Sequence, residues 1–215
     1  MEPLAASPPP RAAAPMRFAV VDVETSGLSP TRHRLLQVAV VVSDASGQVL
    51  DTWVSLVRPR WRWFFRLGPR HIHGLRRTDL RRAEPAPVVL RELSRRIDGA
   101  VLTAHNAEFD MAFLRAAAQR AGVTLDLGTS LCTLWLSRHL DPDRTQSHRL
   151  ADLATRYGVV NGKPHDALED ALATATVLPH LLQAHGVTDA SALVPHLRHA
   201  GEARPHSTPR VTSHS

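Results

Sequence analysis

Two carboxylates stand two residues apart at the end of an apolar segment near the N-terminus. Asp22 and Glu24 follow Phe18 and Val20 at a spacing of two, so all four side chains share one face if this segment is a β-strand. Burying two like charges side by side is costly unless a counter-charge neutralises them, and carboxylate oxygens favour Mg²⁺ or Mn²⁺. The alternative is a strand end that faces water. Alone, this pair leaves both interpretations open.

Two further acidic segments, 104–110 and 165–170, lie where helices are expected to begin. Asp110 falls in the first turn of one helix, where a carboxylate also has the simpler role of stabilising the helix N-terminus. His165 and Asp170 open the longest expected helix and lie about 140° apart around its axis. They can reach one site only if it lies across the start of this helix. For His165 the alternative is a capping or solvent-exposed role, since the chain has 13 histidines.

The three segments together make a stronger prediction than each one alone. Strand ends and helix starts of an α/β sheet commonly meet at one edge, so we expect four carboxylates and one histidine to converge. Four negative charges balance two divalent cations, which is the composition of a two-metal site for phosphoryl transfer. A histidine with a pKa of about 6.5 can take the proton of an attacking water near neutral pH.

An α/β fold has to position these residues. Apolar runs at 17–24, 35–43 and 49–57 predict strands, and the turn residues at 43–48 predict a hairpin between the second and third. Helices are expected at 88–97, 108–121, 131–139, 147–157 and 166–185, and a short strand at 100–104. This order predicts a mixed central β-sheet flanked by helices.

Length and composition suit one domain with tails among the 215 residues. Proline and alanine dominate residues 1–15, which predicts a disordered leader, and Met16 is an alternative start to Met1. A domain over 16–186 is expected, followed by a short helix and a disordered polar tail over 187–215. The single cysteine excludes an intrachain disulfide framework, and no apolar run is long enough for a membrane span. With no secretory signal, we expect a cytoplasmic protein.

Three motifs resemble those of a known enzyme family. Val21-Asp-Val-Glu-Thr-Ser-Gly-Leu28, His105-Asn-Ala-Glu-Phe-Asp110 and His165-Asp-Ala-Leu-Glu-Asp170 resemble the exonuclease motifs of the DEDDh 3′–5′ exonucleases. The resemblance covers about residues 16–185 and is closest to the proofreading epsilon subunit of bacterial DNA polymerase III and its free-standing relatives. It implies a ribonuclease H-like fold and the removal of nucleoside 5′-monophosphates from 3′ ends.

The resemblance also implies roles for single residues. Asp22, Glu24 and Asp170 would bind one of two divalent cations, Mg²⁺ or Mn²⁺. Asp22 would bridge to the second ion, which Asp110 would support, and His165 would be the general base. The residues implied to bind the substrate are Thr25, Ser26, His73, Asn106 and Phe109. For Phe109, packing in the core is an equally good interpretation.

One segment departs from the family, which has a short polar connection at this place. Residues 58–82 contain nine arginines and one acid, Asp79, whereas the rest of the chain has 17 basic and 19 acidic residues. Arginines alternate with aromatic rings at its start, which suits single-stranded nucleic acid, because phosphates meet cations and bases stack on rings. The alternative is an aromatic core with arginines in a solvated loop. The predicted nucleic-acid patch consists of Arg58, Arg60, Trp61, Arg62 and Trp63.

These features predict a metal-dependent 3′–5′ exonuclease acting on single-stranded or frayed 3′ ends of DNA, in proofreading or repair. A DNA polymerase subunit is a candidate partner, and no membrane is expected. A 3′–5′ exoribonuclease of the same superfamily is the enzymatic alternative, because the motifs do not show whether a 2′-hydroxyl is accepted. A non-catalytic nucleic-acid-binding scaffold is the alternative from another class. Such scaffolds usually lose one or more acids, whereas this sequence keeps all four.

Overall fold

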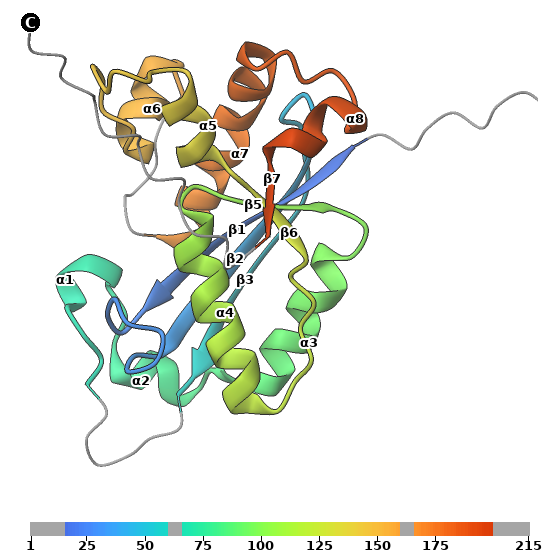
Figure 1. Cartoon of the computed structure of the whole chain (residues 1–215). Coiled ribbons are helices and arrows are strands. Elements are labelled where there is room, and N and C mark those ends of the chain that lie inside the picture. Colours follow the sequence, from blue (N-terminus) through green and yellow to red (C-terminus); the bar gives the residue numbers. More distant parts are fainter. Residues whose placement is uncertain (1–15, 60–65, 160–165, 200–215) are drawn as a thin grey trace, which may run out of the picture.

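The computed structural model describes residues 16–59, 66–159 and 166–199. These residues form a seven-stranded mixed sheet in the order β4-β3-β2-β1-β5-β6-β7, which crosses the centre of the molecule (Figure 1). The predicted mixed α/β architecture is therefore confirmed. The strands are β1 (Arg17–Thr25), β2 (Leu35–Asp44), β3 (Val49–Arg58), β4 (Glu84–Pro85), β5 (Val101–Ala104), β6 (Thr129–Cys132) and β7 (Leu197–His199).

Helices cover both faces of the sheet and its ends. The helices of the described part are α1 (Arg70–His73), α2 (Arg77–Arg81), α3 (Ala86–Ile97), α4 (Ala107–Ala121), α5 (Thr133–His139), α6 (Leu150–Arg156), α7 (Ala167–Ala184), α8 (Ala190–Leu193) and the 3₁₀ turn η1 (Val194–His196). None of these helices combines the length and the apolar character that crossing a membrane requires.

The central strand β1 is buried on both faces, as its continuous apolar sequence predicts. Ala19 and Val21 belong to the core that lies under α3 and α4, whereas Phe18 and Val20 belong to the core under α7. Side chains two apart share a face, so Asp22 and Glu24 continue the Phe18–Val20 row on the α7 side. The two carboxylates are thus carried on a central strand that is packed on both faces.

One edge of β1 is open where the neighbouring strand stops. Parallel pairing between β1 and β5 ends with Val20 opposite Thr103, and the chain turns into α4 soon after Ala104. Antiparallel pairing with β2 continues on the other side as far as Thr25. The backbone of the last residues of β1 is therefore unpaired by strands on the α4 side within the described chain. This branch point between β1 and β5 is where ligands bind in many open α/β sheets.

Several short elements differ from the sequence-based expectations. The helix expected at 131–139 divides into β6 and α5, because Ser130 and Leu131 pair with β5 on one side and β7 on the other. The expected C-terminal helix ends at His196, and the next three residues add β7 to the sheet. The short helices α1 and α2 lie in the arginine-rich segment, where no helix was expected.

Candidate active site

The four predicted carboxylates line one cavity of about 290 Å³. It lies at the end of β1, between the starts of α4 and α7, with α1 and the first residue of α6 completing its wall. Segments that are far apart in the sequence therefore supply one site. The acidic residues of the lining are Asp22, Glu24, Asp110 and Asp170.

Asp110 is held against the open edge of β1. It lies in the first turn of α4 and is 5% exposed. Its carboxylate accepts hydrogen bonds from its own backbone N–H and from that of Val23, the residue between the two carboxylates of β1. The unpaired edge of β1 thus supplies the contact that fixes Asp110 beside Asp22 and Glu24.

The start of α7 supplies two further acids. Asp166 caps the helix, and its carboxylate accepts a hydrogen bond of 3.1 Å from the backbone N–H of Leu168. Asp170 follows one turn later and faces the cavity. Ala167 and Ala171 are fully buried beside β1 and β2, so small side chains allow the helix to approach the sheet closely. His165, the predicted general base, lies outside the described residues.

These carboxylates repel one another in a poorly hydrated place. Burial raises the pKa of Asp22 well above its ordinary value, and the charges of Asp110, Asp170 and Glu24 raise it further. Burial also raises the pKa of Glu24 to about 7, with Asp170 and Asp166 contributing. Asp110 has its pKa raised to about 8, mainly by burial and against the two backbone hydrogen bonds. Such mutual perturbation in a cleft is typical of a functional site.

Divalent cations fit this donor set. The described lining contains four carboxylates, whose oxygens are hard donors, and neither arginine nor lysine, so no fixed positive charge offsets the carboxylates. No three His, Cys, Asp or Glu side chains of the described ranges are grouped closely enough to form a complete set of ligands for one ion. This arrangement still suits Mg²⁺, which commonly keeps several waters and uses one or two carboxylates together with substrate phosphates.

Four of the five predicted substrate residues also line the cavity, namely Thr25, His73, Asn106 and Phe109. Thr25 donates a hydrogen bond of 2.8 Å to the carbonyl of Gly27. Asn106 is exposed at the start of α4, and its side chain makes no capping hydrogen bond. Phe109 meets the ring of Phe113 at 4.9 Å between centroids, so it belongs to the core edge and to the cavity wall at once.

The side chains of His73 and Ser26 have structural partners. His73 lines the cavity, but its Nε2 donates to the Leu67 carbonyl at 3.1 Å and its Nδ1 accepts from the N–H of Leu75 at 3.1 Å. Ser26 is 4% exposed and is not part of the described lining. Its hydroxyl accepts from the N–H of Arg34, which closes the loop after β1. Their contacts with substrate stay predictions.

The predicted nucleic-acid patch is only partly described. Arg58 ends β3 and is exposed. Arg60, Trp61, Arg62 and Trp63 lie outside the described residues. Binding by this patch therefore stays a prediction.

His105 forms part of the cavity wall, although the sequence indicated no role for it. Its Nδ1 lies 3.0 Å from the hydroxyl of Thr133, and the backbone carbonyl of His148 accepts a hydrogen bond from the ring. Burial lowers its pKa to about 4, so the ring is neutral near pH 7. The proton needed for the carbonyl sits on Nε2, and Nδ1 accepts from Thr133.

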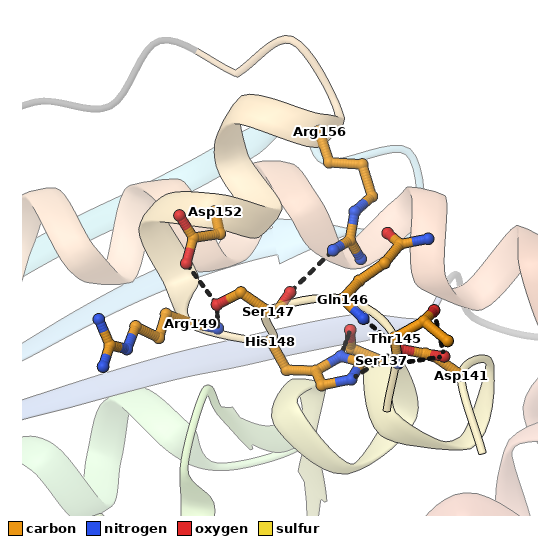
Figure 2. A network of polar contacts seen from close by, with 9 residues as sticks. All are labelled: Ser137, Asp141, Thr145, Gln146, Ser147, His148, Arg149, Asp152 and Arg156. Atoms are coloured by element: carbon orange, nitrogen blue, oxygen red, sulfur yellow. Dashed lines mark hydrogen bonds and ion pairs between the residues drawn. The ribbon is translucent and has the colours of Figure 1, made fainter. Parts of the chain in front are cut away.

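A hydrogen-bonded loop between α5 and α6 supports this wall (Figure 2). Asp141 accepts hydrogen bonds from the backbone N–H groups of Thr145 and Gln146 at 3.1 and 2.9 Å. His148 is buried, with its Nδ1 2.8 Å from the hydroxyl of Ser137 and its Nε2 3.3 Å from Asp141. The loop thereby fixes the carbonyl that holds His105, and it ends at Leu150, which also lines the cavity.

Sequence reasoning missed Asp166, His105 and Leu150. Asp166 and His105 adjoin predicted site residues within the motifs, and this adjacency is the available signal. Leu150 follows an irregular segment, and only the folded loop reveals its place. The three residues show that the cavity depends on neighbours of the recognised acids as well as on the acids themselves.

Comparison with other sequences matches residues 19–178 to the family RNase_T, described as exonuclease. The chain is 34% identical over 177 residues to a protein of Mycobacterium tuberculosis that is provisionally named a bifunctional exonuclease/endonuclease, covering 79% of this chain and 27% of that protein. It is 33% identical over 169 residues to the PolC-type DNA polymerase III of Caldanaerobacter subterraneus, covering 77% of this chain and 12% of the polymerase. The chain thus spans 12–27% of the length of these relatives.

Solved structures share the fold. The nuclease domain of 3'hExo, described as a DEDDh family member bound to rAMP, matches with a TM-score of 0.69 and 18% identity, covering 81% of this chain and 96% of that chain. The zinc-bound complex of Escherichia coli exonuclease I with single-stranded DNA matches with a TM-score of 0.70 and 20% identity, covering 85% of this chain and 43% of that chain. Because the family model matches residues 19–178, which are most of this chain, the chain belongs to the RNase_T family of DEDDh 3′–5′ exonucleases.

Proposed function

We propose that the chain removes nucleoside 5′-monophosphates from 3′ ends of DNA in a reaction that depends on divalent cations. The observation that carries this proposal is the meeting of four carboxylates, from β1, α4 and α7, in one cavity without a described arginine or lysine. A buried negative site of this kind attracts cations and excludes a bare phosphate, so the phosphodiester can approach only together with metal ions.

Two cations, Mg²⁺ or Mn²⁺, are proposed as cofactors, in keeping with the use of divalent metals across the DEDDh family. Asp22, Glu24 and Asp170 would share one ion, in part through water molecules, because the three side chains are not grouped closely enough to ligate it together. Asp22 together with Asp110 would hold the other. When bound, such ions lower the pKa of a water molecule and stabilise charge on the attacking and leaving oxygens. The raised pKa values of Asp22, Glu24 and Asp110 mean that protons compete with these cations up to about neutral pH.

The chain's own groups would position the substrate and move the proton. His165 would accept the proton of the water that attacks the phosphorus, while the bond from phosphorus to the 3′ oxygen of the preceding nucleotide breaks. Asn106 and Phe109 would contact the terminal nucleotide, because they line the same cavity as the carboxylates. Thr25, Ser26 and His73 are proposed to hold its sugar and phosphate. In that case Ser26 would act through its backbone carbonyl, because its hydroxyl and its N–H both form hydrogen bonds with the backbone of Arg34.

DNA is the proposed substrate class, with a role in proofreading or repair. Relatives that carry the names DNA polymerase III PolC-type and 3'-5' exonuclease DinG support this choice. A DNA polymerase subunit is the proposed partner. The alternative of an RNA substrate is supported by the structures of a 3′-exonuclease described as recognising a histone mRNA stem-loop and of 3'hExo bound to rAMP.

A nuclease assay tests these proposals directly. The chain is incubated with 3′ ends of matched sequence as single-stranded DNA, mismatched duplex DNA and RNA, with Mg²⁺, with Mn²⁺ and with chelator. We expect release of mononucleotides from DNA with either ion, and none with Asp22→Asn. Faster cleavage of RNA would replace the proposed substrate class, and cleavage that persists in chelator would refute the proposed chemistry. Co-purification with a polymerase subunit tests the partner separately.

A further inference from the structure

We propose that the exposed arginines around α1 and α2 form a phosphate-binding track, along which the single-stranded DNA behind the terminal nucleotide leaves the cavity. This inference rests on the proposed function, because it needs a 3′ end in the cavity. It concerns residues beyond the predicted patch and uses only described side chains. The track consists of Arg66, Arg70, Arg76, Arg81 and Arg82, all exposed.

The track begins at the rim of the cavity because the backbone next to Arg66 and Arg70 packs against the residues that form the rim. Gly68 has φ +86°, and a Cβ at this position would lie 2.5 Å from the carbonyl oxygen of Ser26. The chain therefore passes in direct contact with the residue that follows the end of β1. Pro69 and His73, on either side of Arg70 in the sequence, both line the cavity. Arg66 and Arg70 are thus fixed next to the place where a 3′-terminal phosphate would enter.

Among the residues that the structure describes, the charges of the track are not used in ion pairs. On α3, by contrast, Glu92 lies 2.7 Å from both Arg95 and Arg96, and Arg96 also pairs with Asp51. In the described part of the chain no ion pair includes any of the five track arginines. The acid of α2, Asp79, accepts the backbone N–H of Arg76 at 2.8 Å and so serves the start of this helix.

The positive charge of the track favours a polyanion as its ligand, and the cavity favours a polyanion with an unpaired, single-stranded 3′ end. Glu24 and Asp110 are buried, and Asp22 and Asp170 are half-buried, in a cavity at the end of β1, so a 3′ end has to be unpaired to reach them. The five arginines are exposed and none of them lines the cavity, and Figure 1 shows α1 and α2, around which they lie in the sequence, beside the loop that follows β1. A single strand with its last nucleotide in the acidic cavity would place its preceding phosphates on this basic surface. Arginine is well suited to phosphate contacts because its guanidinium is a bidentate donor.

Removal of two track charges tests the inference. The double variant Arg70→Gln/Arg81→Gln is compared with Arg91→Gln/Arg115→Gln, which removes the same charge from exposed positions on α3 and α4. The probe is a short oligothymidylate with phosphorothioate linkages at its 3′ end, and its Kd is measured over a range of salt. Each phosphate contact contributes about 0.7 to the slope of log K against log salt, or about fivefold in affinity near 0.1 M salt. The track variant should therefore bind about 25-fold more weakly, with a slope lower by about 1.4, while the control variant binds like the wild type.

Two results would overturn the track. One is a track variant with the same Kd and salt slope as the control variant, once thermal unfolding has shown both to be folded. The other is an equal loss of binding to blunt duplex DNA, whose 3′ end cannot enter the cavity without unpairing. Hydrolysis of the p-nitrophenyl ester of thymidine 5′-phosphate by the wild-type chain tests the proposed function separately, because this substrate has no phosphate beyond the one in the cavity. If the chain does not hydrolyse the ester but its binding of oligothymidylate still depends on the track arginines, the proposed exonuclease function is refuted and the track stands as a nucleic-acid-binding surface.

Discussion

His105 should make the fold sensitive to mildly acidic pH. The ring is held between Thr133 and the carbonyl of His148, and burial lowers its pKa from 6.5 to about 4. In the unfolded chain the pKa returns to its ordinary value. Between these two values the unfolded chain binds a proton that the native chain does not, so acidification favours unfolding. The stability that the neutral ring provides is fully present above pH 6.5 and is lost as the pH falls towards 4.

The size of the effect follows from the difference in pKa. One unit corresponds to about 1.4 kcal/mol, so the fall from 6.5 to about 4 is worth about 3 kcal/mol, of which about 2 kcal/mol is lost by about pH 5. The carboxylates act in the opposite direction. Glu24, with its pKa raised to about 7, takes up a proton in the native state first, so its contribution to stability improves on acidification. The free energy of unfolding of the wild-type protein therefore contains contributions of opposite sign as the pH falls: His105 lowers it and Glu24 raises it.

A matched variant isolates the histidine. His105→Gln keeps a donor for the His148 carbonyl and removes the titrating ring, while the carboxylates stay in place. Urea unfolding of both proteins in chelator, at pH 7 and pH 5, gives their free energies of unfolding. We expect the advantage of the wild type over the variant to shrink by about 2 kcal/mol at the lower pH. A difference that is the same at both pH values would refute the reasoning.

Three further predictions concern the acids and the rim of the cavity. Asp22→Asn should abolish hydrolysis of 3′ ends yet raise the unfolding temperature of the metal-free chain at pH 8, because it removes a buried charge; a lower unfolding temperature would contradict this. Mg²⁺ or Mn²⁺ should raise the unfolding temperature more at pH 8 than at pH 6, since protons compete for Glu24; equal shifts in thermal melts would count against it. Gly68→Ala should lower the free energy of unfolding by about 1–3 kcal/mol in urea titrations, because φ is +86° and the methyl group meets Ser26; an unchanged midpoint would show that the segment moves freely.

The long elements of the fold were predictable because hydrophobic pattern determines them. β1 and β2 are mostly apolar, β3 follows β2 across a polar turn, and α4 and α7 present long alanine- and leucine-rich faces to the sheet. Elements of two to five residues, such as β4, β7 and α2, are too short to show a period. β6 depends on its two neighbouring strands, which is tertiary information that Leu131 and Ser130 do not carry by themselves.

The candidate site divides in the same way. Spacing alone indicated that Asp22 and Glu24 share a face, and the order of elements indicated that Asp110 and Asp170 would join them. What could not be predicted is the environment: the charge of Asp166 acting on Glu24, and the wall that the carbonyl of His148 builds around His105. These contacts depend on how a loop folds against the sheet, and an irregular loop has no periodic pattern from which the direction of its carbonyl groups could be deduced.

The hydrogen bond from the N–H of Val23 to Asp110 has a consequence for how this protein can change over generations. The donor is a main-chain group, so every amino acid except proline supplies it, and mutation at position 23 leaves the anchor intact as long as the strand survives. The acid at 110 has no such freedom, because only its own side chain can accept that bond. Drift in this part of the molecule is therefore one-sided: position 23 is buried in the core and accepts other apolar side chains that fit there, while the acid that its N–H orients has to be inherited unaltered.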